Sequence, residues 1–520
     1  MQREAMVRRI RERAASGEPW DLVVIGGGAT GMGVAVDAAA RGFDVALLEA
    51  HDFGKGTSSR STKLVHGGVR YLEQGNVALV MSALKERGLL RQNAPHLVHD
   101  LAFVVPNYSW WEAPFYGIGL KLYDLLAGKY GFGASKVLTK EETLDRLPAL
   151  EPEELRGGVI YYDGQFDDAR LLIHLAMTAA DKGATLVNYC PATALERDAE
   201  GYINGVTARD EETGEVLALP ARVVVNATGV FTDSVRHMAD ANAEPLVVTS
   251  QGIHLVFDGS FLRSQTALMV PRTSDGRVLF VIPWHGHAVA GTTDTPVDAP
   301  SLEPRALDEE IEFVLETAGR YLTRPPSRAD VRAVYVGLRP LVKGEGKTSA
   351  LSRDHVIHVD GSGLLTITGG KWTTYRHMAE DTVDHAITLG RLRDEPCTTR
   401  DLHIHGYSET THETDSLAVY GADADAIRAL AQEPRLAAQL HPELPVIAAE
   451  VVWAAREEMA RSVDDVLARR TRALFLHAEA ASAMAEPVAA LLAAELGHDA
   501  AWQAAQVAEF RELAKQYKVV

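Results

Sequence analysis

The chain has 520 residues and carries 52 Lys and Arg against 71 Asp and Glu, a formal net charge of −19. Its 46% hydrophobic and 24% charged residues are typical of a globular protein and exclude a disordered, fibrous or collagen-like chain. At roughly 100–200 residues per domain, this length allows about three domains. The acidic balance argues against general binding to nucleic acid, whose phosphates require a basic surface.

The cysteine content and the apolar runs limit the cellular context. The two cysteines, Cys190 and Cys397, form no CxxC motif, so we expect neither a disulfide scaffold nor a zinc ribbon. No uninterrupted apolar run reaches the roughly 18–20 residues that a bilayer-spanning helix needs. Residues 1–20 hold no apolar core and therefore do not resemble a secretory signal. We expect an intracellular protein, either in solution or at a membrane surface.

The first strongly patterned stretch predicts a βαβ unit. An apolar strand over 21–25 ends in the glycine turn Gly26-Gly27-Gly28-Ala29-Thr30-Gly31. A helix of small residues over 32–41 follows, and then a second strand over 45–48 that is closed by Glu49. A GxGxxG motif alone is weak evidence, but here it follows a strand, opens a helix and precedes an acidic residue at the required distance.

Each part of this unit has a physical role. Gly26 permits the tight turn, Gly28 lets backbone amides approach a pyrophosphate, and Gly31 lets helix and strand pack closely. The N-terminus of the helix offers free N–H groups and the positive end of its dipole to the phosphates. Glu49 accepts hydrogen bonds from ribose hydroxyls and repels a 2′-phosphate. The unit therefore favours FAD or NAD over NADP.

Later segments extend the predicted organisation. Residues 222–229 and 364–370 are buried-strand patterns that end in small-residue turns, and we expect them to return to the same sheet. Short strands over 278–282 and 288–290 are expected in a different, antiparallel layer. From about residue 400 the composition favours helices, and over 462–475 five apolar residues are expected to share one helix face. These five are Val463, Val466, Leu467, Leu474 and Phe475.

Two pairs of histidines have a spacing that suits one face of a strand. They are His285-x-His287 and His403-x-His405. No third ligand stands at a telling spacing from either pair. We therefore expect surface or structural histidines and no metal site.

Seven sequence blocks together resemble one enzyme family. The run Gly56–Glu73 (GTSSRSTKLVHGGVRYLE) follows the first βαβ unit, and six shorter blocks follow it. They are Tyr162–Arg170 (YDGQFDDAR), Asn226–Gly229 (NATG), Ile282–Asp294 (with IPW and GTTD), Gly337–Leu341 (GLRPL), Ser352–Asp354 (SRD) and Gly369–Arg376 (GGKWTTYR). With the glycine turn, these ordered blocks strongly resemble the FAD-dependent glycerol-3-phosphate dehydrogenases, over roughly residues 20–395.

The resemblance implies a fold class and a domain plan. The class is α/β, with an FAD-binding Rossmann-like domain of the glutathione-reductase and D-amino-acid-oxidase type, a mixed-sheet substrate domain and a C-terminal all-α domain. The expected parts are an N-terminal basic extension (1–19), the FAD-binding domain in three pieces (20–100, 166–250 and 336–395), the substrate domain in two pieces (101–165 and 251–335) and the helical domain (396–520).

The resemblance also implies an activity. Family members oxidise sn-glycerol 3-phosphate to dihydroxyacetone phosphate by hydride transfer from C2 to flavin N5, and they pass the electrons to a membrane quinone. The phosphate is close to a dianion at neutral pH, which calls for arginines that pair bidentately and stay protonated. Arg339 and Arg353 match the family's phosphate-binding arginines, and Arg70 and Tyr71 lie near flavin and substrate in the family. Lys371 is expected to polarise the substrate oxygen or to stabilise reduced flavin.

Two histidines compete for the role of the base that takes the hydroxyl proton. His254 matches an active-site histidine of the family and is assigned to substrate contact, whereas His66 precedes a glycine pair and is assigned to flavin contact. An unperturbed histidine pKa near 6.5 suits proton abstraction at neutral pH. With these two, Lys371 and Arg339 complete the expected catalytic set. The expected cofactor contacts are Gly26, Gly28, Thr30, Gly31, Glu49, Ala50, Thr57, Ser58, Ser59, Lys63, Leu64, His66, Gly67, Gly68, Ala227, Thr228, Gly229, Gly370, Lys371 and Thr373.

Two segments bear on membrane contact. Residues 1–19 are predicted to form a short basic helix, which suits either solvent or an anionic surface. The aromatic cluster over 110–123 suits a bilayer interface and equally a domain core. Because the family docks on membranes to reach quinone, we expect a cytoplasmic protein attached peripherally to the inner face of the cell membrane. The oligomeric state stays open, with a homodimer among the candidates.

Three other functions share parts of this pattern. A glycerol-3-phosphate oxidase uses the same flavin and substrate but hands the electrons to oxygen and releases hydrogen peroxide. An amine or amino-acid oxidase of the same fold recognises a carboxylate and does not need a cluster of arginines. A flavin-binding module without catalysis would be expected to lose the arginines and lysine of the site, which this chain retains.

Overall fold

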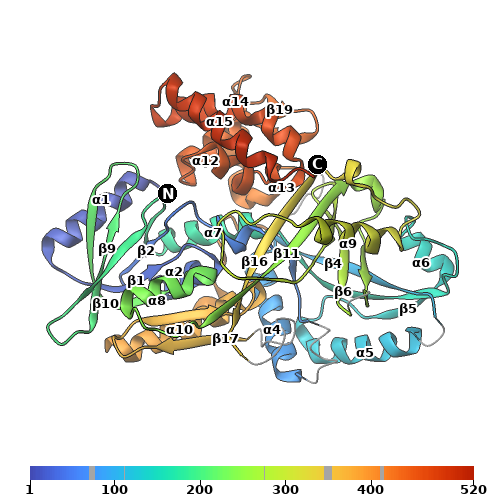
Figure 1. Ribbon diagram of the computed structural model, residues 1–520, viewed down its shortest axis with the longest axis horizontal. Helices are drawn as coiled ribbons and strands as arrows, with labels where there is room; N and C mark the ends of the chain where they lie inside the picture. Colours follow the sequence, from blue (N-terminus) through green and yellow to red (C-terminus); the bar gives the residue numbers. More distant parts are fainter. Residues whose placement is uncertain (69–75, 110–111, 274–275, 345–353, 410–414, 520) are drawn as a thin grey trace.

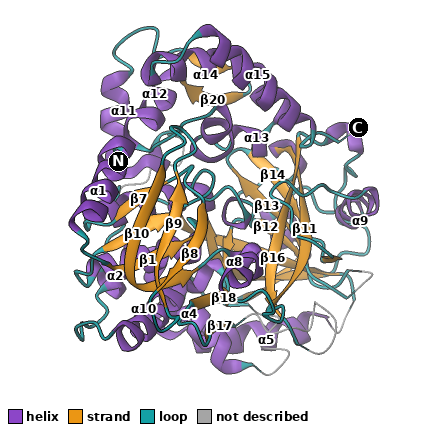
Figure 2. Cartoon of the chain, turned by 60° about the vertical axis from the view of Figure 1, so that its left-hand side comes forward, coloured by secondary structure: helices purple, strands orange, loops and turns teal. Residues whose placement is uncertain are grey.

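The computed structural model describes the chain except for residues 69–75, 110–111, 274–275, 345–353, 410–414 and 520 (Figure 1). Two large β-sheets lie side by side, and a mostly helical C-terminal region, red in Figure 1, lies across one end of both. Figure 2 shows the strands of the two sheets as separate groups with helices around them.

The first sheet is built around the predicted βαβ unit. Its central strand β1 pairs in parallel with β2 on one side and with β10 on the other. β18 and β7 continue the parallel part, and β17 adds an antiparallel edge. The strand order is β17 (His355–Val359), β18 (Leu365–Gly369), β10 (Val216–Asn226), β1 (Trp20–Ile25), β2 (Val45–Leu48) and β7 (Thr185–Val187), with β9 (Ile203–Arg209) and β8 (Ala192–Arg197) attached to β10. The strands expected at 21–25 and 45–48, and those expected within 222–229 and 364–370, are thus confirmed as β1, β2, β10 and β18.

Both faces of this sheet are covered, which explains why its strands are continuous apolar runs. On β1, Leu22 and Val24 pack against three helices, whereas Val23 and Ile25 pack on the opposite face toward α1. Each fully buried Leu, Val or Ile side chain contributes about 1.5–3 kcal/mol to folding. The three helices are α2 (Ala29–Ala40), which begins earlier than the predicted residue 32, α7 (Asp168–Asp181) and α10 (Tyr375–Gly390).

The N-terminal extension is part of the first domain. α1 (Arg3–Ser16) buries Val7 and Ile10 against the sheet, where they are 3% and 0% exposed. The Arg3 guanidinium is buried and pairs with the Asp210 carboxylate at 2.6 Å. The prediction that this helix lies in solvent or on an anionic surface is therefore wrong, because the domain's own sheet covers its apolar side.

The second sheet is mixed, as predicted. Its strands pair antiparallel except for β12 and β4, which are parallel. The order is β15 (Thr295–Val297), β11 (Val247–Asp258), β14 (His287–Gly291), β13 (Leu279–Trp284), β12 (Ala267–Val270), β4 (Val98–Asn107), β6 (Gly157–Phe166) and β3 (Leu64–Val65), with β16 (Ala333–Val342) paired to β11 and β5 (Lys136–Thr139) to β6. The antiparallel strands expected over 278–282 and 288–290 are confirmed as β13 and β14.

Strand pairing corrects two of the expected domain limits. All of β16 pairs with β11, so the limit expected between residues 335 and 336 cuts a strand of the second sheet. β3 pairs with β6, although residues 20–100 were assigned to the first domain. Helices α4 (Val77–Asn93), α5 (Glu112–Ala127), α6 (Lys140–Arg146) and α9 (Asp308–Gly319) surround the second sheet, and α8 (Thr232–Ala239) follows β10.

The C-terminal region is helical apart from one hairpin. Its helices are α11 (Ala424–Leu430), α12 (Ala448–Glu457), α13 (Ala473–Leu476), α14 (Ala478–Leu496) and α15 (Ala500–Lys515), and its hairpin is β19 (Gln439–His441) with β20 (Leu444–Ile447). The five apolar residues expected to share one helix over 462–475 are all buried, but they are not on one helix: Val466 and Leu467 lie in one short element, Leu474 and Phe475 lie in another, and Val463 precedes both. A π-helical turn over Asp465–Arg470 is separated from α13 by Arg472, whose φ of 60° is left-handed.

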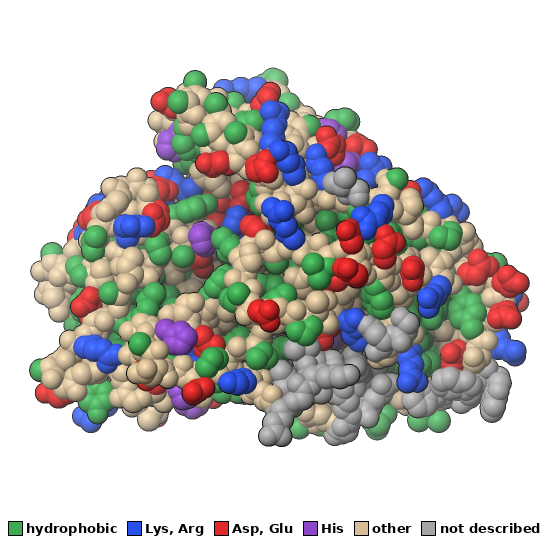
Figure 3. Space-filling model, in the orientation of Figure 1, with side chains coloured by type: hydrophobic (Ala, Val, Ile, Leu, Met, Phe, Trp, Pro, Cys, Tyr) green, Lys and Arg blue, Asp and Glu red, His purple; other side chains and the backbone are tan. Residues whose placement is uncertain are grey.

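The surface of the protein carries charges of both signs. On the face shown in Figure 3, acidic and basic side chains are interspersed. Within the residues that the structure covers, no helix is both long and apolar enough to cross a bilayer. Over the same residues, no group of three or more His, Cys, Asp and Glu is arranged to hold a metal ion. His405 lies between two carboxylates, Asp181 at 2.7 Å and Asp423 at 2.9 Å, and its pair with Asp181 links α7 to the C-terminal region.

A buried ionic contact joins the C-terminal region to the first sheet. The Asp52 carboxylate accepts two hydrogen bonds from Arg470, at 2.6 and 2.9 Å, and one from Arg469. All three side chains are at most 2% exposed. Burial alone would raise the pKa of Asp52, but the two guanidinium groups outweigh burial and hold this pKa below its usual value.

We expect the substitution Asp52→Asn to lower the free energy of unfolding by about 3–5 kcal/mol, because it removes the buried anion that Arg469 and Arg470 share. Thermal and urea unfolding of the holoprotein measure the loss. Glu215→Gln, which removes the anion of the solvent-exposed pair with Arg11, is the matched control and should leave the midpoint within error. Equal shifts in the two variants would contradict the assignment.

Candidate active site

A cleft of about 360 Å³ lies at the carboxyl ends of β1, β2, β10 and β18. This edge is where parallel α/β sheets bind their ligands. The predicted contacts that line the cleft are Gly26, Gly28, Thr30, Glu49, Ala50, Thr57, Ser58, Ala227, Thr228, Gly229, Gly370 and Lys371. The cleft therefore brings together four motifs that lie far apart in the sequence.

The glycine turn has the close approaches that the sequence predicts. Gly26 has a φ of +111°, and a Cβ there would lie 2.7 Å from the carbonyl oxygen of Ala227. A Cβ on Gly31 would lie 2.0 Å from the carbonyl oxygen of Gly26, so only glycine lets the helix pack on the turn. Gly31 thus supports the cleft from behind without lining it. Gly28, at the N-cap of α2, faces the Ser58 hydroxyl, which accepts a hydrogen bond from the Ala29 amide at 2.9 Å.

Glu49 is fixed at the end of β2. Its carboxylate oxygens accept hydrogen bonds from the Gly27 amide at 2.6 Å and from the His51 amide at 2.9 Å. Burial raises the pKa of Glu49 more than these two hydrogen bonds lower it. Each carboxylate oxygen has two lone pairs, so both still have capacity for a further donor. This geometry suits the predicted contact with ribose hydroxyls.

Two residues in the cleft belong to the predicted GGKWTTYR block but were not selected from the sequence. Trp372 donates its indole N–H to the Ser58 carbonyl oxygen at 2.8 Å and so joins two walls of the cleft. Tyr375 lines the cleft at the start of α10. Pro191 and Leu302 also line it and carried no signal in the sequence, because their position follows from tertiary packing alone.

Lys63 is not placed to contact a cofactor. Its side chain is 0% exposed, and its ammonium donates to Asp168 at 2.8 and 2.9 Å and to the Ser59 carbonyl oxygen at 2.7 Å. The aromatic rings of Trp284, Tyr335 and Phe475 surround the same ammonium at 4.8–5.3 Å. The structure corrects Lys63 from a cofactor contact to a buried ion pair.

The remaining predicted cofactor contacts lie beside the cleft, outside its lining. The His66 amide donates to the Thr373 hydroxyl at 3.2 Å, and the Gly67 amide donates to the Tyr123 hydroxyl at 2.8 Å. The first bond brings the His66 loop against the GGKWTTYR block, and the second ties it to α5. The flavin roles of Ser59, Leu64, His66, Gly67, Gly68 and Thr373 stay predictions.

His254 lies on β11 and faces the loop that precedes β3. Its Nε2 atom lies 2.9 Å from the Thr62 hydroxyl, and its ring stacks on Tyr335 with centroids 4.8 Å apart. Burial, and secondarily the charges of Lys63 and Arg339, hold the pKa of His254 well below its usual value. The pKa of His254 thus departs from the unperturbed value considered above, and the lowered pKa favours the neutral imidazole at pH 7.

Arg339 lies on β16, and its guanidinium is 19% exposed. It donates to the carbonyl oxygens of Gln251 at 3.2 Å and of Thr293 at 2.9 Å, and it pairs with Asp294 at 3.2 Å. β11 and β16 pair so that Ser250 faces Arg339 and His254 faces Tyr335. Since alternate residues share a face, Arg339 and His254 lie on the same face of the second sheet. The other predicted substrate contacts, Arg70, Tyr71 and Arg353, lie outside the described residues.

Comparison with known proteins identifies the family. The FAD dependent oxidoreductase family matches residues 21–376, and the family described as the C-terminal domain of alpha-glycerophosphate oxidase matches residues 365–503. A probable mitochondrial glycerol-3-phosphate dehydrogenase of Caenorhabditis elegans is 41% identical over 96% of this chain and 73% of its own length. The chain belongs to the glycerol-3-phosphate dehydrogenase family.

Solved structures agree with this membership. The glycerol-3-phosphate dehydrogenase of Bacillus halodurans, complexed with FAD, has a TM-score of 0.79 and 30% identity and covers 97% of this chain and 96% of its own. The L-alpha-glycerophosphate oxidase of Mycoplasma pneumoniae has a TM-score of 0.56 at 17% identity over 73% of this chain and 97% of its own, which shows a shared fold. FAD is thus the cofactor of this glycerol-3-phosphate dehydrogenase family member, and the glycine turn, Glu49 and the open N-terminus of α2 fit it.

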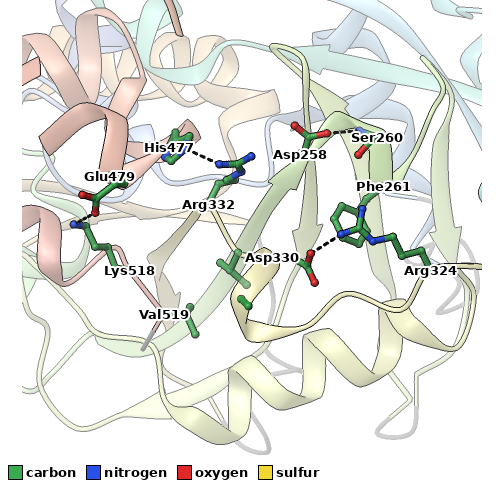
Figure 4. A pocket seen from close by; sticks show the side chains of 12 residues that line it. Asp258, Ser260, Phe261, Arg324, Asp330, Arg332, His477, Glu479, Lys518 and Val519 are labelled. Atoms are coloured by element: carbon green, nitrogen blue, oxygen red, sulfur yellow. Dashed lines mark hydrogen bonds and ion pairs between the residues drawn. The ribbon is translucent and has the colours of Figure 1, made fainter. Parts of the chain in front are cut away.

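A second cavity, of about 490 Å³, lies between the second sheet and the chain's C-terminal end (Figure 4). Its basic side chains are matched by acidic partners: Arg324 pairs with Asp330 at 2.7 Å, and Lys518 pairs with Glu479. These pairs form a salt-bridged seam. None of the residues that line this cavity belongs to a family block, so it is not the candidate site.

We expect Glu49→Ala to weaken FAD binding roughly 10–100-fold, because the hydrogen bonds of a charged acceptor contribute about 1.5–3 kcal/mol. FAD content after purification and reconstitution of the apoprotein with FAD measure the effect. Glu18→Ala removes an exposed acid outside the cleft and should retain full FAD content. Unchanged FAD affinity in Glu49→Ala would remove this residue from the cofactor site.

Proposed function

We propose that this protein oxidises sn-glycerol 3-phosphate to dihydroxyacetone phosphate and passes the electrons to a membrane quinone. Bound FAD would supply the hydride acceptor, its N5 atom taking the hydride from C2 of the substrate. The observation that carries the proposal is the placement of Arg339 and His254 on one face of the second sheet. Membership of the glycerol-3-phosphate dehydrogenase family supports the choice of substrate.

The two side chains offer complementary chemistry to this substrate. Arg339 is a permanent cation with forked donors, which suits the phosphate dianion. His254 is neutral, and its Nδ1 atom is buried and has no hydrogen-bond partner among the residues that the structure describes. We assign Nδ1 as the acceptor of the C2 hydroxyl proton. Lys371, in the wall of the cleft, is assigned to the substrate oxygen, and His66 to the flavin side of the site.

The register of β11 and β16 sets the space between Arg339 and His254. Gly252 lies between Ser250 and His254 on β11, opposite Gly337 of β16. A Cβ on Gly337 would lie 2.4 Å from the carbonyl oxygen of Arg60, and one on Gly252 would lie 2.2 Å from the Arg339 guanidinium. Gly337 therefore lets the segment that leads from the cleft toward β3 approach the sheet, and Gly252 leaves room for the Arg339 guanidinium. Substrate held by Arg339 would thus lie near both His254 and the cofactor cleft.

The alternative function is a glycerol-3-phosphate oxidase that reduces oxygen to hydrogen peroxide. Both enzymes need the same flavin and phosphate contacts, so the electron acceptor alone separates them. We favour quinone, because the relatives at 30–41% identity named above are called dehydrogenases, whereas the oxidase resembles this chain at 17% identity.

Anaerobic mixing of the holoprotein with sn-glycerol 3-phosphate should bleach the flavin absorbance at about 450 nm. The bleached sample is then divided between oxygen and a soluble quinone. Fast reoxidation by quinone and slow reoxidation by oxygen is the expected result. Fast reoxidation by oxygen with release of peroxide would establish the oxidase, and no bleaching of protein with full FAD content would refute the proposed substrate.

We also propose that the protein docks peripherally on the inner face of the cell membrane, through α5. Ile118, Leu122 and Leu125 recur at i, i+4 and i+7 on this helix and are 74%, 45% and 76% exposed. Met81 of the neighbouring α4 is 51% exposed. α5 lies along the lower edge of the molecule in Figure 1. An apolar helix face of this kind suits the interface of a bilayer.

Replacing Ile118, Leu122 and Leu125 together by Asp should abolish co-sedimentation with vesicles of mixed zwitterionic and anionic lipid. Flavin reduction by glycerol 3-phosphate in solution should be preserved, since these side chains point away from the protein core. Val216→Asp, at another exposed apolar residue, is the control and should leave vesicle binding intact. Light scattering tests the alternative that this face is a homodimer interface. That alternative would hold if the parent protein were a dimer that does not bind vesicles and the triple variant were a monomer.

A further inference from the structure

We propose that Thr62 is the positioning residue for His254. Its hydroxyl oxygen accepts the Nε2 proton of the imidazole and thereby fixes the tautomer in which Nδ1 carries a lone pair. The inference rests on the proposed function, in which Nδ1 takes the substrate's hydroxyl proton. It adds the group that decides which ring nitrogen performs that task.

The His254 ring has little freedom to turn. One face stacks on Tyr335, with ring centroids 4.8 Å apart and an interplanar angle of 14°. The edge of the ring packs on Gly291, where a Cβ would lie 2.4 Å from the His254 Cδ2 atom. With 3% exposure, the ring cannot exchange its partner at Nε2 for solvent. The Thr62 hydroxyl, at 2.9 Å, is therefore the hydrogen-bond partner of Nε2, and the proposal assigns it the role of acceptor.

The residues on both sides of Thr62, Ser61 and Lys63, contact one buried carboxylate. Asp168 accepts hydrogen bonds from the Ser61 amide at 3.0 Å and from the Ser61 hydroxyl at 2.7 Å. It also pairs with the Lys63 ammonium at 2.8 Å. Tyr335 donates its hydroxyl to the Ser61 carbonyl oxygen at 3.1 Å, so the residue that stacks on the imidazole also holds the segment that carries Thr62. Position and orientation of the Thr62–His254 pair are thus set together.

The charges around His254 keep its imidazole neutral, so the tautomer decides whether Nδ1 can accept a proton. Lys63 and Arg339 face the imidazole and disfavour its protonated form, while their own partners are Asp168 and Asp294. The stacked Tyr335 stays neutral, because burial raises its pKa well above the usual value. His254 therefore carries one ring proton at pH 7. If that proton were on Nδ1, the ring could not accept a proton there.

The test compares Thr62→Val, which removes the acceptor at nearly constant volume, with Thr62→Ser, which keeps it. Anaerobic stopped-flow mixing with sn-glycerol 3-phosphate gives the rate of flavin reduction and the substrate dissociation constant between pH 5 and 9. Thr62→Val should reduce the rate roughly 10–100-fold, with the dissociation constant changed by less than about threefold. Thr62→Ser should stay within about threefold of the parent.

The pH profile gives a readout that loss of packing would not move. The imidazolium formed during the reaction donates from Nε2 more strongly than the neutral ring does, so losing the acceptor destabilises it and lowers the His254 pKa further. The acid limb of the rate profile should consequently move to lower pH in Thr62→Val and stay in place in Thr62→Ser. Thr143→Val removes a buried hydroxyl on α6, away from His254, and should change neither rate nor profile.

Three results would overturn the inference. They are a parental rate in Thr62→Val, an acid limb that does not move despite a lower rate, and equal losses in the Val and Ser variants. Should Thr62→Val not retain FAD, Thr62→Cys, whose sulfur accepts weakly, replaces it in the same comparison. A failure of the proposed function is distinct: the parent protein would not bleach, or His254→Gln would keep the parental rate.

Discussion

The Asp52 carboxylate, buried between the guanidinium groups of Arg469 and Arg470, is the contact on which the placement of the cofactor loop depends. Asp52 comes three residues after Glu49, and the two arginines come from the C-terminal region. Removing three charges from water costs several kcal/mol per ion, so such a cluster is kept only where its geometry is complete. Further acceptors surround the two arginines here: Asp465 accepts from Arg469 at 2.9 Å, and the Glu458 carbonyl accepts from Arg470 at 2.8 Å.

The same segment is held at further points by partners from other parts of the chain. Lys55 pairs with Glu303 at 3.1 Å and with Asp464, and Arg60 pairs with Glu303 at 2.7 Å. Residues 50–63 thus connect the first sheet, the second sheet and the C-terminal region. A loop alone would be mobile, but ionic contacts from three directions give it one conformation. The helical region therefore acts on the site through this segment without lining the cofactor cleft.

The sequence predicted those parts of the site that depend on local backbone geometry. The turn from Gly26 to Gly31, the acid at Glu49 and the strand ends at Ala227 and Gly370 all meet in the cleft, because each is fixed by its own strand and turn. The contacts of long side chains were harder to predict, since the direction of such a side chain depends on residues far away in the chain. Lys63 is the clearest case: its motif suggested a cofactor contact, but Asp168 and three aromatic rings draw its ammonium into the core.

Burial also changes the pKa of a histidine from the value that the sequence alone suggests. A histidine pKa near 6.5 holds for a solvated ring, and only the fold places His254 between Tyr335, Lys63 and Arg339. In the same way, the basic N-terminal helix suggested a membrane contact until its apolar side was found on the first sheet. The exposed apolar face that the fold does leave lies on α5, inside the aromatic region that the sequence had marked as either core or interface.

Under the proposed function, Arg339 would recognise a phosphate without large rearrangement. Two carbonyl oxygens and Asp294 already hold its guanidinium, so little side-chain entropy remains to be lost when an anion binds. Asp294 also offsets part of the arginine's charge, which reduces the cost of keeping this cation partly buried before substrate arrives. A phosphate dianion then has to outweigh one carboxylate, whereas a monoanionic carboxylate substrate would gain less from the same arginine. The arrangement thus favours a dianionic substrate over the amino acids used by other enzymes of this fold.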